Sequence, residues 1–357
     1  MSASAIADIQ RLVECQSPTE DLAACTKVVD LAVEIANKVL STPAKAITEN
    51  GRPVFWWGAE NPKIVLLCHL DTVWPHNSFD PIWKIEGDNA KGPGVFDMKA
   101  GFVQALYAVK DIAGAESKVA LVATTDEETG SATSKGLIER LAKGADAVLV
   151  FESAIDGKVK TGRKGTSMYQ VVVTGKAAHA GLEPEKGINA TVELAKLVLQ
   201  ITALENPALG TTVVPTVMQS GTTTNTVPAQ AKLDIDIRSF TMAELNRVDA
   251  AIKSLTSDTA KVDVVGGINR PPLEISSTKE LYEKLELVAK SLGMSEIGHA
   301  SVGGASDGNL AAAAGAKVLD GLGAVGVGAH APTESLVISS VEPRIKLTTA
   351  FITELLK

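Results

Sequence analysis

The first part of the chain alternates between apolar runs and amphipathic stretches. Three runs, "IVLLCHL" (64–70), "KVALVATT" (118–125) and "DAVLVFE" (146–152), are almost continuously apolar, which is typical of strands buried on both faces of a sheet. Helical periodicity predicts helices at about 21–40, 99–113 and 132–143, and Ser17 and Glu20 have the spacing of a capping box before the first. This alternation predicts an α/β fold with a largely parallel sheet flanked by helices.

After about residue 165 the pattern changes. A strand at 167–175, a helix at 187–204, the strands "TTVVPTVMQS" and "AKLDIDIRS", a helix capped by Thr241 and Glu244, and the strand "AKVDVVG" form the order β-α-β-β-α-β. That order indicates a ferredoxin-like α+β domain. "GGINRPPLE" (266–274) reads as a linker, and the first pattern resumes with a helix capped by Ser277 and Glu280 and a final helix at 339–356. The prediction is a domain of residues 1–165 and 275–357, with residues 166–274 inserted into it.

Composition excludes several classes of protein. The 357 residues are 45% hydrophobic and carry a net charge of −8, without a basic stripe that would favour nucleic acid or an anionic membrane as a partner. Three cysteines, Cys15, Cys25 and Cys68, are odd in number and lack C-x-x-C spacing, which favours free thiols in a reducing compartment. The sequence shows no signal-peptide pattern and no run of the ~20 apolar residues that a membrane span needs. A cytoplasmic protein is expected.

Ionisable residues follow the ends of the predicted strands. His69 and Asp71 end the first strand and project to the same side at a period of two. Further ionisable residues, Asp97, the run Asp126–Glu128 and Glu152, lie after other predicted elements, and each alone has an ordinary explanation as a helix cap, a solvated turn or a strand-end charge. Together they would meet at one edge of a parallel sheet, where unpaired carboxylates repel each other. We therefore expect divalent cations there, held by two histidines and three carboxylates, a set that suits zinc. The residues are His69, Asp97, Glu128, Glu152 and His330, with Glu127 beside them.

Asp71 has a different expected role. A histidine that binds a metal commonly donates its second ring N–H to a carboxylate, which fixes its tautomer. We expect His69 to be a ligand and Asp71 to orient it.

Six motifs occur together in order along the chain: "HLDTVWP", "GPGVFDMKAG", "TTDEETGS", "FES", "GKAAHAG" and "GGASDG". In these motifs the sequence resembles the dinuclear zinc aminoacylase and carboxypeptidase family, the M20-type metallopeptidases, over nearly its whole length. The residues of these motifs resemble those of the glutamate carboxypeptidase branch most. The resemblance implies that His69 and Glu152 hold one metal, that Glu128 and His330 hold the other, and that Asp97 bridges both. It also implies a cis peptide bond between Asp97 and Met98, and Glu127 as the general base.

The resemblance extends into the inserted domain, which would act as a lid and a dimerisation domain. His179 in "KAAHAG" resembles the histidine that reaches a neighbouring subunit's active site to stabilise the developing oxyanion. Arg238 in "DIDIRS" resembles the arginine that grips the substrate's carboxylate, with Asn225 as a companion. Gly304 and Ser306 in "GGASDG" would line the substrate pocket.

The expected activity is hydrolysis of an amide bond next to a free carboxylate, which releases a C-terminal amino acid from a small peptide or N-acyl substrate. Two zinc ions would serve the reaction, with cobalt or manganese as substitutes. An N-acyl-amino-acid deacylase, of the acetylornithine deacetylase or desuccinylase type, and a dipeptidase remain open. Two other classes are less favoured. "GLGAVG" (321–326) matches a dinucleotide-binding fingerprint but lacks a helical pattern after it, and a non-catalytic descendant of the fold would be expected to have lost Glu127 or a ligand.

Overall fold

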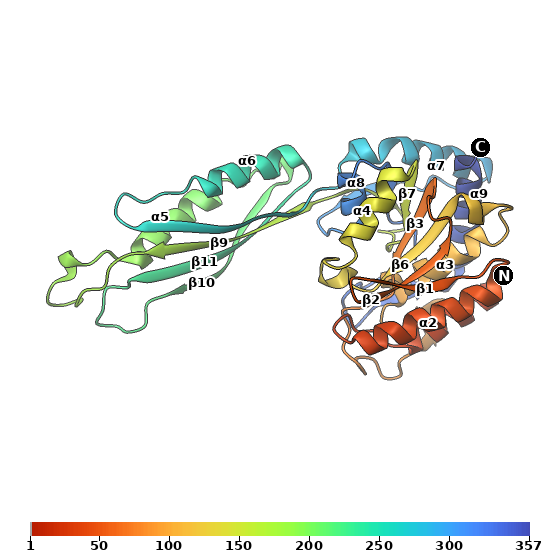
Figure 1. Cartoon of the computed structure of the whole chain (residues 1–357), viewed down its shortest axis with the longest axis horizontal. Helices are drawn as coiled ribbons and strands as arrows, with labels where there is room; N and C mark the ends of the chain where they lie inside the picture. Colours follow the sequence, from red (N-terminus) through yellow and green to blue (C-terminus); the bar gives the residue numbers. More distant parts are fainter. Residues whose placement is uncertain (1) are drawn as a thin grey trace. The chain divides into compact units, whose positions relative to one another are not determined.

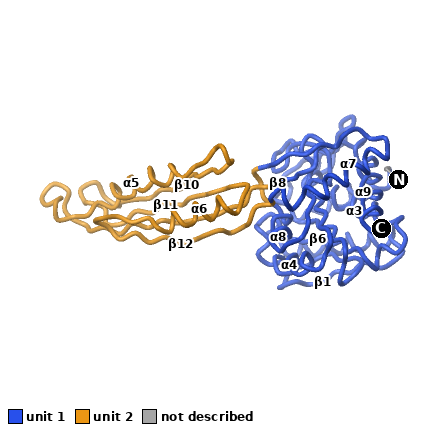
Figure 2. The backbone as a smooth tube through the Cα atoms, turned by 90° about the horizontal axis from the view of Figure 1, so that it is seen from above, with its two compact units in different colours: residues 1–162, 274–302, 306–357 blue, residues 163–273, 303–305 orange. Residues whose placement is uncertain are grey.

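The computed structural model describes residues 2–357, and the chain divides into two compact units (Figure 2). The first comprises the residues up to Gly162 together with Glu274–Val302 and Ser306–Lys357. The second, called the inserted unit below, comprises Arg163–Leu273 and Gly303–Ala305. The sequence placed the inserted segment at 166–274; the short stretch 303–305 joins it through contacts made in space. No helix among residues 2–357 combines the length and apolar character needed to cross a membrane.

The sheet of the first unit has the strand order β1-β2-β6-β3-β7-β14 (Figure 1). Strands β6, β3, β7 and β14 run parallel, whereas β2 pairs antiparallel with β6 and β1 with β2. The predicted largely parallel sheet flanked by helices is therefore confirmed. The strands are β1 (Lys45–Glu49), β2 (Arg52–Gly58), β3 (Ile64–His69), β6 (Val119–Thr124), β7 (Ala147–Val150) and β14 (Val318–Leu319).

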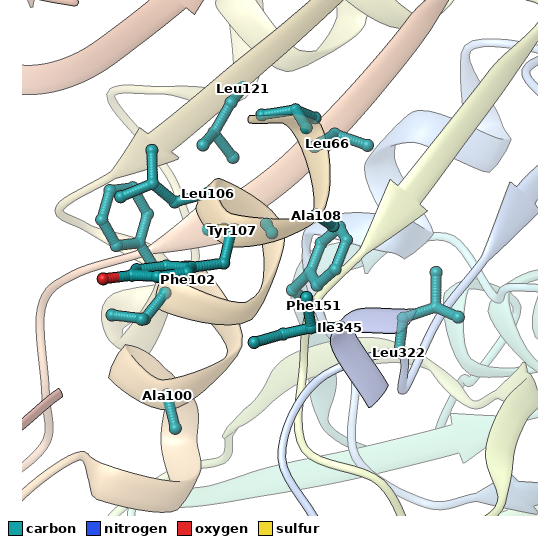
Figure 3. Packing of buried hydrophobic residues seen from close by; sticks show 14 of the residues in the cluster. Leu66, Ala100, Phe102, Leu106, Tyr107, Ala108, Leu121, Phe151, Leu322 and Ile345 are labelled. Atoms are coloured by element: carbon teal, nitrogen blue, oxygen red, sulfur yellow. The ribbon is translucent and has the colours of Figure 1, made fainter. Parts of the chain in front are cut away.

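Burial on both faces explains the continuous apolar runs. In β3, Ile64, Leu66 and Cys68 join the large core cluster with residues of α3 and α9, so the alternate residues Val65 and Leu67 point to the opposite face, where they are also buried. Figure 3 shows Leu66 and Leu121 of the sheet above the residues of α3. The rings of Phe55 and Phe102 meet edge to face at 4.9 Å.

Helices cover both faces of this sheet. Helix α3 packs with α9, α1 and α2 and lies against β3 and β6, while α2 lies along β1 and β2 (Figure 1). Helices α4 and α8 pack against each other, and α8 contacts β7. The helices are α1 (Ser2–Glu14), α2 (Leu22–Val39), α3 (Ala100–Val109), α4 (Lys135–Gly144), α7 (Lys279–Ser291), α8 (Asp307–Ala313) and α9 (Val341–Leu355).

Two small sheets complete the first unit. One joins β8 (Val159–Arg163) to β13 (His299–Val302), and the other has the order β15-β16-β5-β4. The strands of the latter are β4 (Lys84–Glu86), β5 (Asn89–Lys91), β15 (Gly326–Val327) and β16 (Ser335–Val337). The second sheet brings the segment after "GLGAVG" beside the turn that precedes Asp97, since β16 pairs with β5.

The inserted unit has the predicted β-α-β-β-α-β order. Its antiparallel sheet, β10-β11-β9-β12, buries Tyr169, Val171 and Leu233 against one layer of two helices. The elements are β9 (Gly165–Thr174), α5 (Ala190–Thr202), β10 (Thr212–Ser220), β11 (Gln230–Ser239), α6 (Met242–Lys253) and β12 (Lys261–Arg270).

Several local predictions are wrong. Helix α2 is capped by Asp21, which accepts the N–H of Ala24, whereas Ser17 donates its hydroxyl to the carbonyl of Leu70. Helix α7 starts after Thr278 rather than at a Ser277–Glu280 box. The stretch at 266–270 is the end of β12 and not a linker, because it pairs with β9 despite its glycines. The predicted cap of α6 is confirmed: Thr241 accepts the N–H of Glu244.

Candidate metal centre

His69 is the last residue of β3, and its buried imidazole points into a group of carboxylates. Its Nδ1 lies 3.1 Å from the main-chain oxygen of Asp71 and 3.4 Å from Oδ1 of the same residue. Its Nε2 lies 3.4 Å from Oδ1 of Asp97 and 3.4 Å from Oε1 of Glu152. A proton on Nδ1, donated to the nearby carbonyl, leaves the Nε2 lone pair directed at the carboxylates, the orientation that a metal ligand needs.

The closer of the two acceptors is the main-chain carbonyl of Asp71, not its carboxylate. The carboxylate has other partners: its Oδ2 accepts the hydroxyl of Thr19 at 2.8 Å and the N–H of Glu128 at 3.2 Å. Asp71 thus connects the strand end that carries His69 to the turn that carries Glu128.

Asp97 lies in the turn Val95–Lys99, which follows Gly94 in the left-handed region (φ 71°). A Cβ atom at position 94 would lie 2.5 Å from the Thr72 side chain. The positive φ and this close approach both favour glycine here. The Asp97–Met98 peptide bond is cis, as the family resemblance implies. The two carboxylate oxygens of Asp97 face different histidines: Oδ1 is 3.4 Å from Nε2 of His69, and Oδ2 is 3.5 Å from Nε2 of His330. One carboxylate between two imidazoles is the arrangement expected of a bridging ligand.

His330 and Glu128 form the second side of the group. Nε2 of His330 lies 3.1 Å from Oε2 of Glu128, and His330 itself has a positive φ of 60°, an uncommon conformation for a residue other than glycine. Such outliers cluster at functional sites, where surrounding contacts hold them.

Glu127 and Glu152 complete the group. Glu127 starts the short turn after β6 and has a carboxylate oxygen within 4.8 Å of ligand atoms of both His69 and Glu152. Glu152 follows β7, and its Oε2 lies 4.0 Å from Nζ of the buried Lys160. Thus the structure brings together all six residues that the sequence predicted at the sheet edge.

Neighbouring charges and burial shift the pKa values of this group. The ion pairs with Asp97 and Glu128 raise the pKa of His330 to about 10. Burial opposes protonation of His69, but Asp71, Asp97 and Glu152 outweigh it and raise its pKa well above the ordinary value. Burial favours a higher pKa for Asp97, but His330 and His69 outweigh it and hold that pKa below the usual range. For Glu128, burial prevails and raises the pKa to about 7. These shifts show that the carboxylates of this group favour positive charge beside them, which bound metal ions can supply.

The donor set fits divalent metal ions. Among the described residues, three buried atoms that lack a hydrogen-bond partner converge here: Nε2 of His69, Oδ1 of Asp97 and Oε1 of Glu128. Leaving such atoms without partners is costly unless a ligand satisfies them. His69, Asp97 and Glu128 offer ligand atoms within 4.8 Å of one another, as do His69, Glu127 and Glu152. Imidazole and carboxylate donors are those that zinc and similar ions prefer.

His179, Asn225 and Arg238, which the sequence also predicted, lie in the inserted unit. His179 is exposed, and its Nδ1 accepts the N–H groups of Gly181 and Leu182, so the ring proton sits on Nε2. Asn225 lies beside it, because the bridge between His179 and Thr226 joins the two loops, and its side chain is exposed. Arg238 donates from Nε and Nη2 to the carboxylate of Asp236.

The glycine-rich segment has a more structural role than predicted. The carbonyl of Gly304 accepts a hydrogen bond from Arg163. Ser306 is fully buried: its hydroxyl accepts the N–H of Gly308 in a capping box at α8 and donates to Asp320. Ser306 thus exposes no hydroxyl to a substrate in this structure, and the prediction that it lines the pocket does not agree with its burial.

Comparisons with known proteins decide the family. The model of "Peptidase family M20/M25/M40" matches residues 65–354. The chain belongs to this family. It is 33% identical to carboxypeptidase G2 of Pseudomonas sp. over 318 residues, which cover 84% of this chain and 75% of that protein. It is 27% identical to succinyl-diaminopimelate desuccinylase of Sulfurovum sp. over 306 residues, 80% of this chain and 81% of that one.

Solved structures agree at the level of fold. The aminopeptidase PepT of Bacillus cereus has a TM-score of 0.80 at 20% identity, covering 100% of this chain and 99% of its own. The M20 metallo-carboxypeptidase Sso-CP2 of Sulfolobus solfataricus has a TM-score of 0.72 at 18% identity, covering 98% and 99%. As an M20 peptidase the protein is a hydrolase, and the use of divalent metals that the family implies agrees with the cluster of ligand atoms described above.

Sequence reasoning missed several residues of this M20 site. Lys160 places a buried ammonium near Glu152, and Thr19 holds the carboxylate of Asp71. Glu334 accepts hydrogen bonds from the turn of Asp97. Its position four residues after His330, in "HAPTE", is the signal that could have drawn attention to it. The segment 321–326 leads into β15 rather than into a helix, which agrees with the rejection of a dinucleotide site.

Proposed function

We propose that this M20 peptidase is a two-metal hydrolase that cleaves an amide bond next to a free carboxylate and releases a C-terminal amino acid. The observation that carries the proposal is the position of Asp97, whose two oxygens face His69 and His330 separately. His69 and Glu152 would hold one ion, and Glu128 and His330 the other. Zinc is the favoured metal, with cobalt or manganese as substitutes. When bound, the ions would lower the pKa of a water molecule and polarise the scissile carbonyl.

Glu127 is the proposed general base. Its carboxylate lies at the edge of the ligand group, within 4.8 Å of ligand atoms of His69 and Glu152. A carboxylate there can take the proton of the attacking water and deliver it to the amine that leaves, which is general base and then general acid catalysis by one group.

Residues of the inserted unit would recognise the substrate. Arg238 would grip the carboxylate of the substrate, and Asp236 keeps its guanidinium in a fixed orientation by two hydrogen bonds. The outward Nε2–H of His179 is a donor that suits an oxyanion, and Asn225 and the main chain at Gly304 would assist binding.

We also propose that the inserted unit forms a homodimer interface and acts as a lid. Strand β10 is an edge of its sheet and exposes Val214, Val217 and Met218, and α5 exposes Leu199. Edges of this kind favour pairing with another chain. His179 would then serve the site of the neighbouring subunit, as the family resemblance implies. A cytoplasmic location remains a prediction, supported by the free thiols of Cys15, Cys25 and Cys68.

A second candidate is an N-acyl-amino-acid deacylase, which the similarity to the desuccinylase supports. A dipeptidase is a third. All three activities would use the same metal centre and would bind a carboxylate of the substrate. They differ in the group on the carbonyl side of the amide bond that is cleaved.

The test is a hydrolysis screen with zinc or cobalt supplied. Its substrates are glutamate-ended dipeptides, N-acetyl and N-succinyl amino acids, and the same compounds with the C-terminal carboxylate amidated. We expect cleavage of compounds with a free carboxylate and little of their amides. Glu127→Ala should lower kcat by about 100-fold or more while metal stays bound, and the exposed Glu139→Ala is the matched control. Equal cleavage of the amides, or full activity of Glu127→Ala, would contradict the proposal.

A further inference from the structure

Glu334 is completely buried and accepts four hydrogen bonds. Its Oε1 accepts the main-chain N–H groups of Phe96 at 2.9 Å and Asp97 at 3.0 Å. Its Oε2 accepts the main-chain N–H of Gly94 at 3.1 Å and the indole N–H of Trp74 at 2.6 Å. Two of these donors belong to the turn that carries Asp97, and a third, Gly94, directly precedes that turn.

The bonding pattern requires an ionised carboxylate. Each oxygen receives two N–H donors, so both oxygens must act as acceptors only. A glutamine of the same size would place an NH₂ group against two N–H donors and lose two of the four bonds. Glu334 has both of its oxygens committed to these donors, so it is not suited to ligate a metal itself.

Glu334 also lies on the segment that carries His330. This segment is folded tightly: the N–H of Ala331 donates to the carbonyl of Gly328, and the N–H of Glu334 donates to the carbonyl of Ala331. Glu334 and Asp97 are 237 positions apart in the sequence. The carboxylate therefore fastens the loop of one predicted ligand directly onto the turn of another.

We propose that Glu334 is a positioning residue that sets the distance between the Asp97 turn and the His330 loop, so that the Asp97 carboxylate can serve two metal ions. This inference rests on the proposed two-metal function. It assigns Glu334 no contact with the substrate and no proton transfer. Partners of this kind hold the residues that bind the metal in place, and losing one typically lowers metal affinity or activity about 10–100-fold.

The experiment compares Glu334→Gln with Glu286→Gln in the full chain. Glu286 is the matched control, because its carboxylate likewise accepts two main-chain N–H groups of a loop, from Ile297 and Gly298 at 3.0 Å, but it is not bonded to the metal-centre turns. Each protein is stripped of metal and titrated with Co²⁺, whose absorption spectrum reports ligand geometry. Denaturant unfolding of the metal-free proteins measures the purely structural effect.

We expect Glu334→Gln to bind Co²⁺ about 10–100-fold more weakly and to show an altered cobalt spectrum, while Glu286→Gln keeps the wild-type affinity and spectrum. Wild-type affinity and spectrum in Glu334→Gln would overturn the inference, as would an equal loss in both variants. If Glu334→Gln fails to fold, Trp74→Phe, which removes a single donor, decides: a changed spectrum supports the role and an unchanged spectrum refutes it. These readouts need no substrate, so a protein that binds cobalt as expected but hydrolyses no amide would refute the proposed function alone.

Discussion

The two oxygens of the Asp71 carboxylate face different partners, and this asymmetry allows its structural and functional roles to be separated by mutation. Oδ2 accepts both the Thr19 hydroxyl and the Glu128 N–H, whereas Oδ1 faces Nδ1 of His69 at 3.4 Å. In Asp71→Asn, an amide oxygen in the Oδ2 position keeps both hydrogen bonds, and the amide nitrogen then faces His69. A donor there favours the tautomer with its proton on Nε2, the atom that must bind the metal.

The magnitudes differ between the two substitutions at this position. Asp71→Ala leaves two buried donors without an acceptor, at about 1–3 kcal/mol each, or about 2–6 kcal/mol in total. That is a large part of the about 5–15 kcal/mol that stabilises a typical domain. Asp71→Asn should cost about 1 kcal/mol of stability or less, because both bonds are kept. It should nevertheless lower metal affinity about 10–100-fold, which corresponds to about 1.4–2.7 kcal/mol.

The assay pairs urea unfolding of the metal-free proteins with competition for zinc against a chromophoric chelator. Thr19→Val is the matched control, because it removes one hydrogen bond to Oδ2 without placing a donor against His69; we expect lower stability with metal affinity close to wild type. The reasoning fails if Asp71→Asn unfolds as readily as Asp71→Ala, or if it binds zinc as tightly as the wild type. The second result would mean that the main-chain carbonyl of Asp71, 3.1 Å from Nδ1, fixes the tautomer by itself.

Three further predictions concern metal, acid and substrate. Removal of metal by a chelator should abolish hydrolysis and lower the unfolding temperature, since an ion present at 100 times its Kd stabilises the folded state by about 2.7 kcal/mol; an unchanged melting curve would contradict the metal centre. Arg247 holds the pKa of Glu244 at about 2, below its ordinary value, so the stability that this pair contributes is present above about pH 4.3 and is lost as the pH falls towards 2. Glu244→Gln should therefore flatten the acid side of the stability profile, and an identical profile would refute the assignment. Arg238→Lys should raise KM for substrates with a free carboxylate more than it lowers kcat, because a lysine cannot form the bidentate grip; a loss of kcat alone would argue against this role.

The sequence identified the predicted ligands because a simple geometric rule connects them. Continuous apolar runs show which strands are buried on both faces, and residues after the ends of parallel strands meet at one edge. His69, Glu128 and Glu152 follow β3, β6 and β7 in this way, and these three strands are neighbours in the sheet. Asp97 and His330 lie on loops that follow no strand of this sheet, so the need to balance the carboxylate charges had to support their place in the group, and the family resemblance then assigned their roles as bridge and ligand.

The hairpin of β1 and β2 was missed because β2 carries little sequence signal. The segment 52–58, "RPVFWWG", contains a proline, and its run of buried aromatic residues is short, so it has no distinctive period. Proline can occupy this place because Pro53 stands near the start of β2. The linker predicted at 266–274 is wrong over 266–270 and shows the reverse case. The glycines at 266 and 267 suggested a loop, yet Gly266 adopts a φ of 114° within a paired strand, and a side chain there would clash with the carbonyl of Met168.

Three buried carboxylates that support the site share one physical task. The ligands sit on turns that follow strands, and turns do not hold a side chain to a fraction of an ångström by themselves. Buried carboxylates supply what the turns lack by accepting main-chain N–H groups: Asp71 binds the turn of Glu128, Glu334 binds the turn of Asp97, and Asp126 accepts the N–H groups of Thr133 and Ser134 behind Glu127 and Glu128. In each case the partner is a main-chain group, which every residue has, so the residue types of the donors do not mark the contact. These contacts form only when the ligand turns are folded. The geometry of such a centre therefore depends on the supporting carboxylates as well as on the ligands.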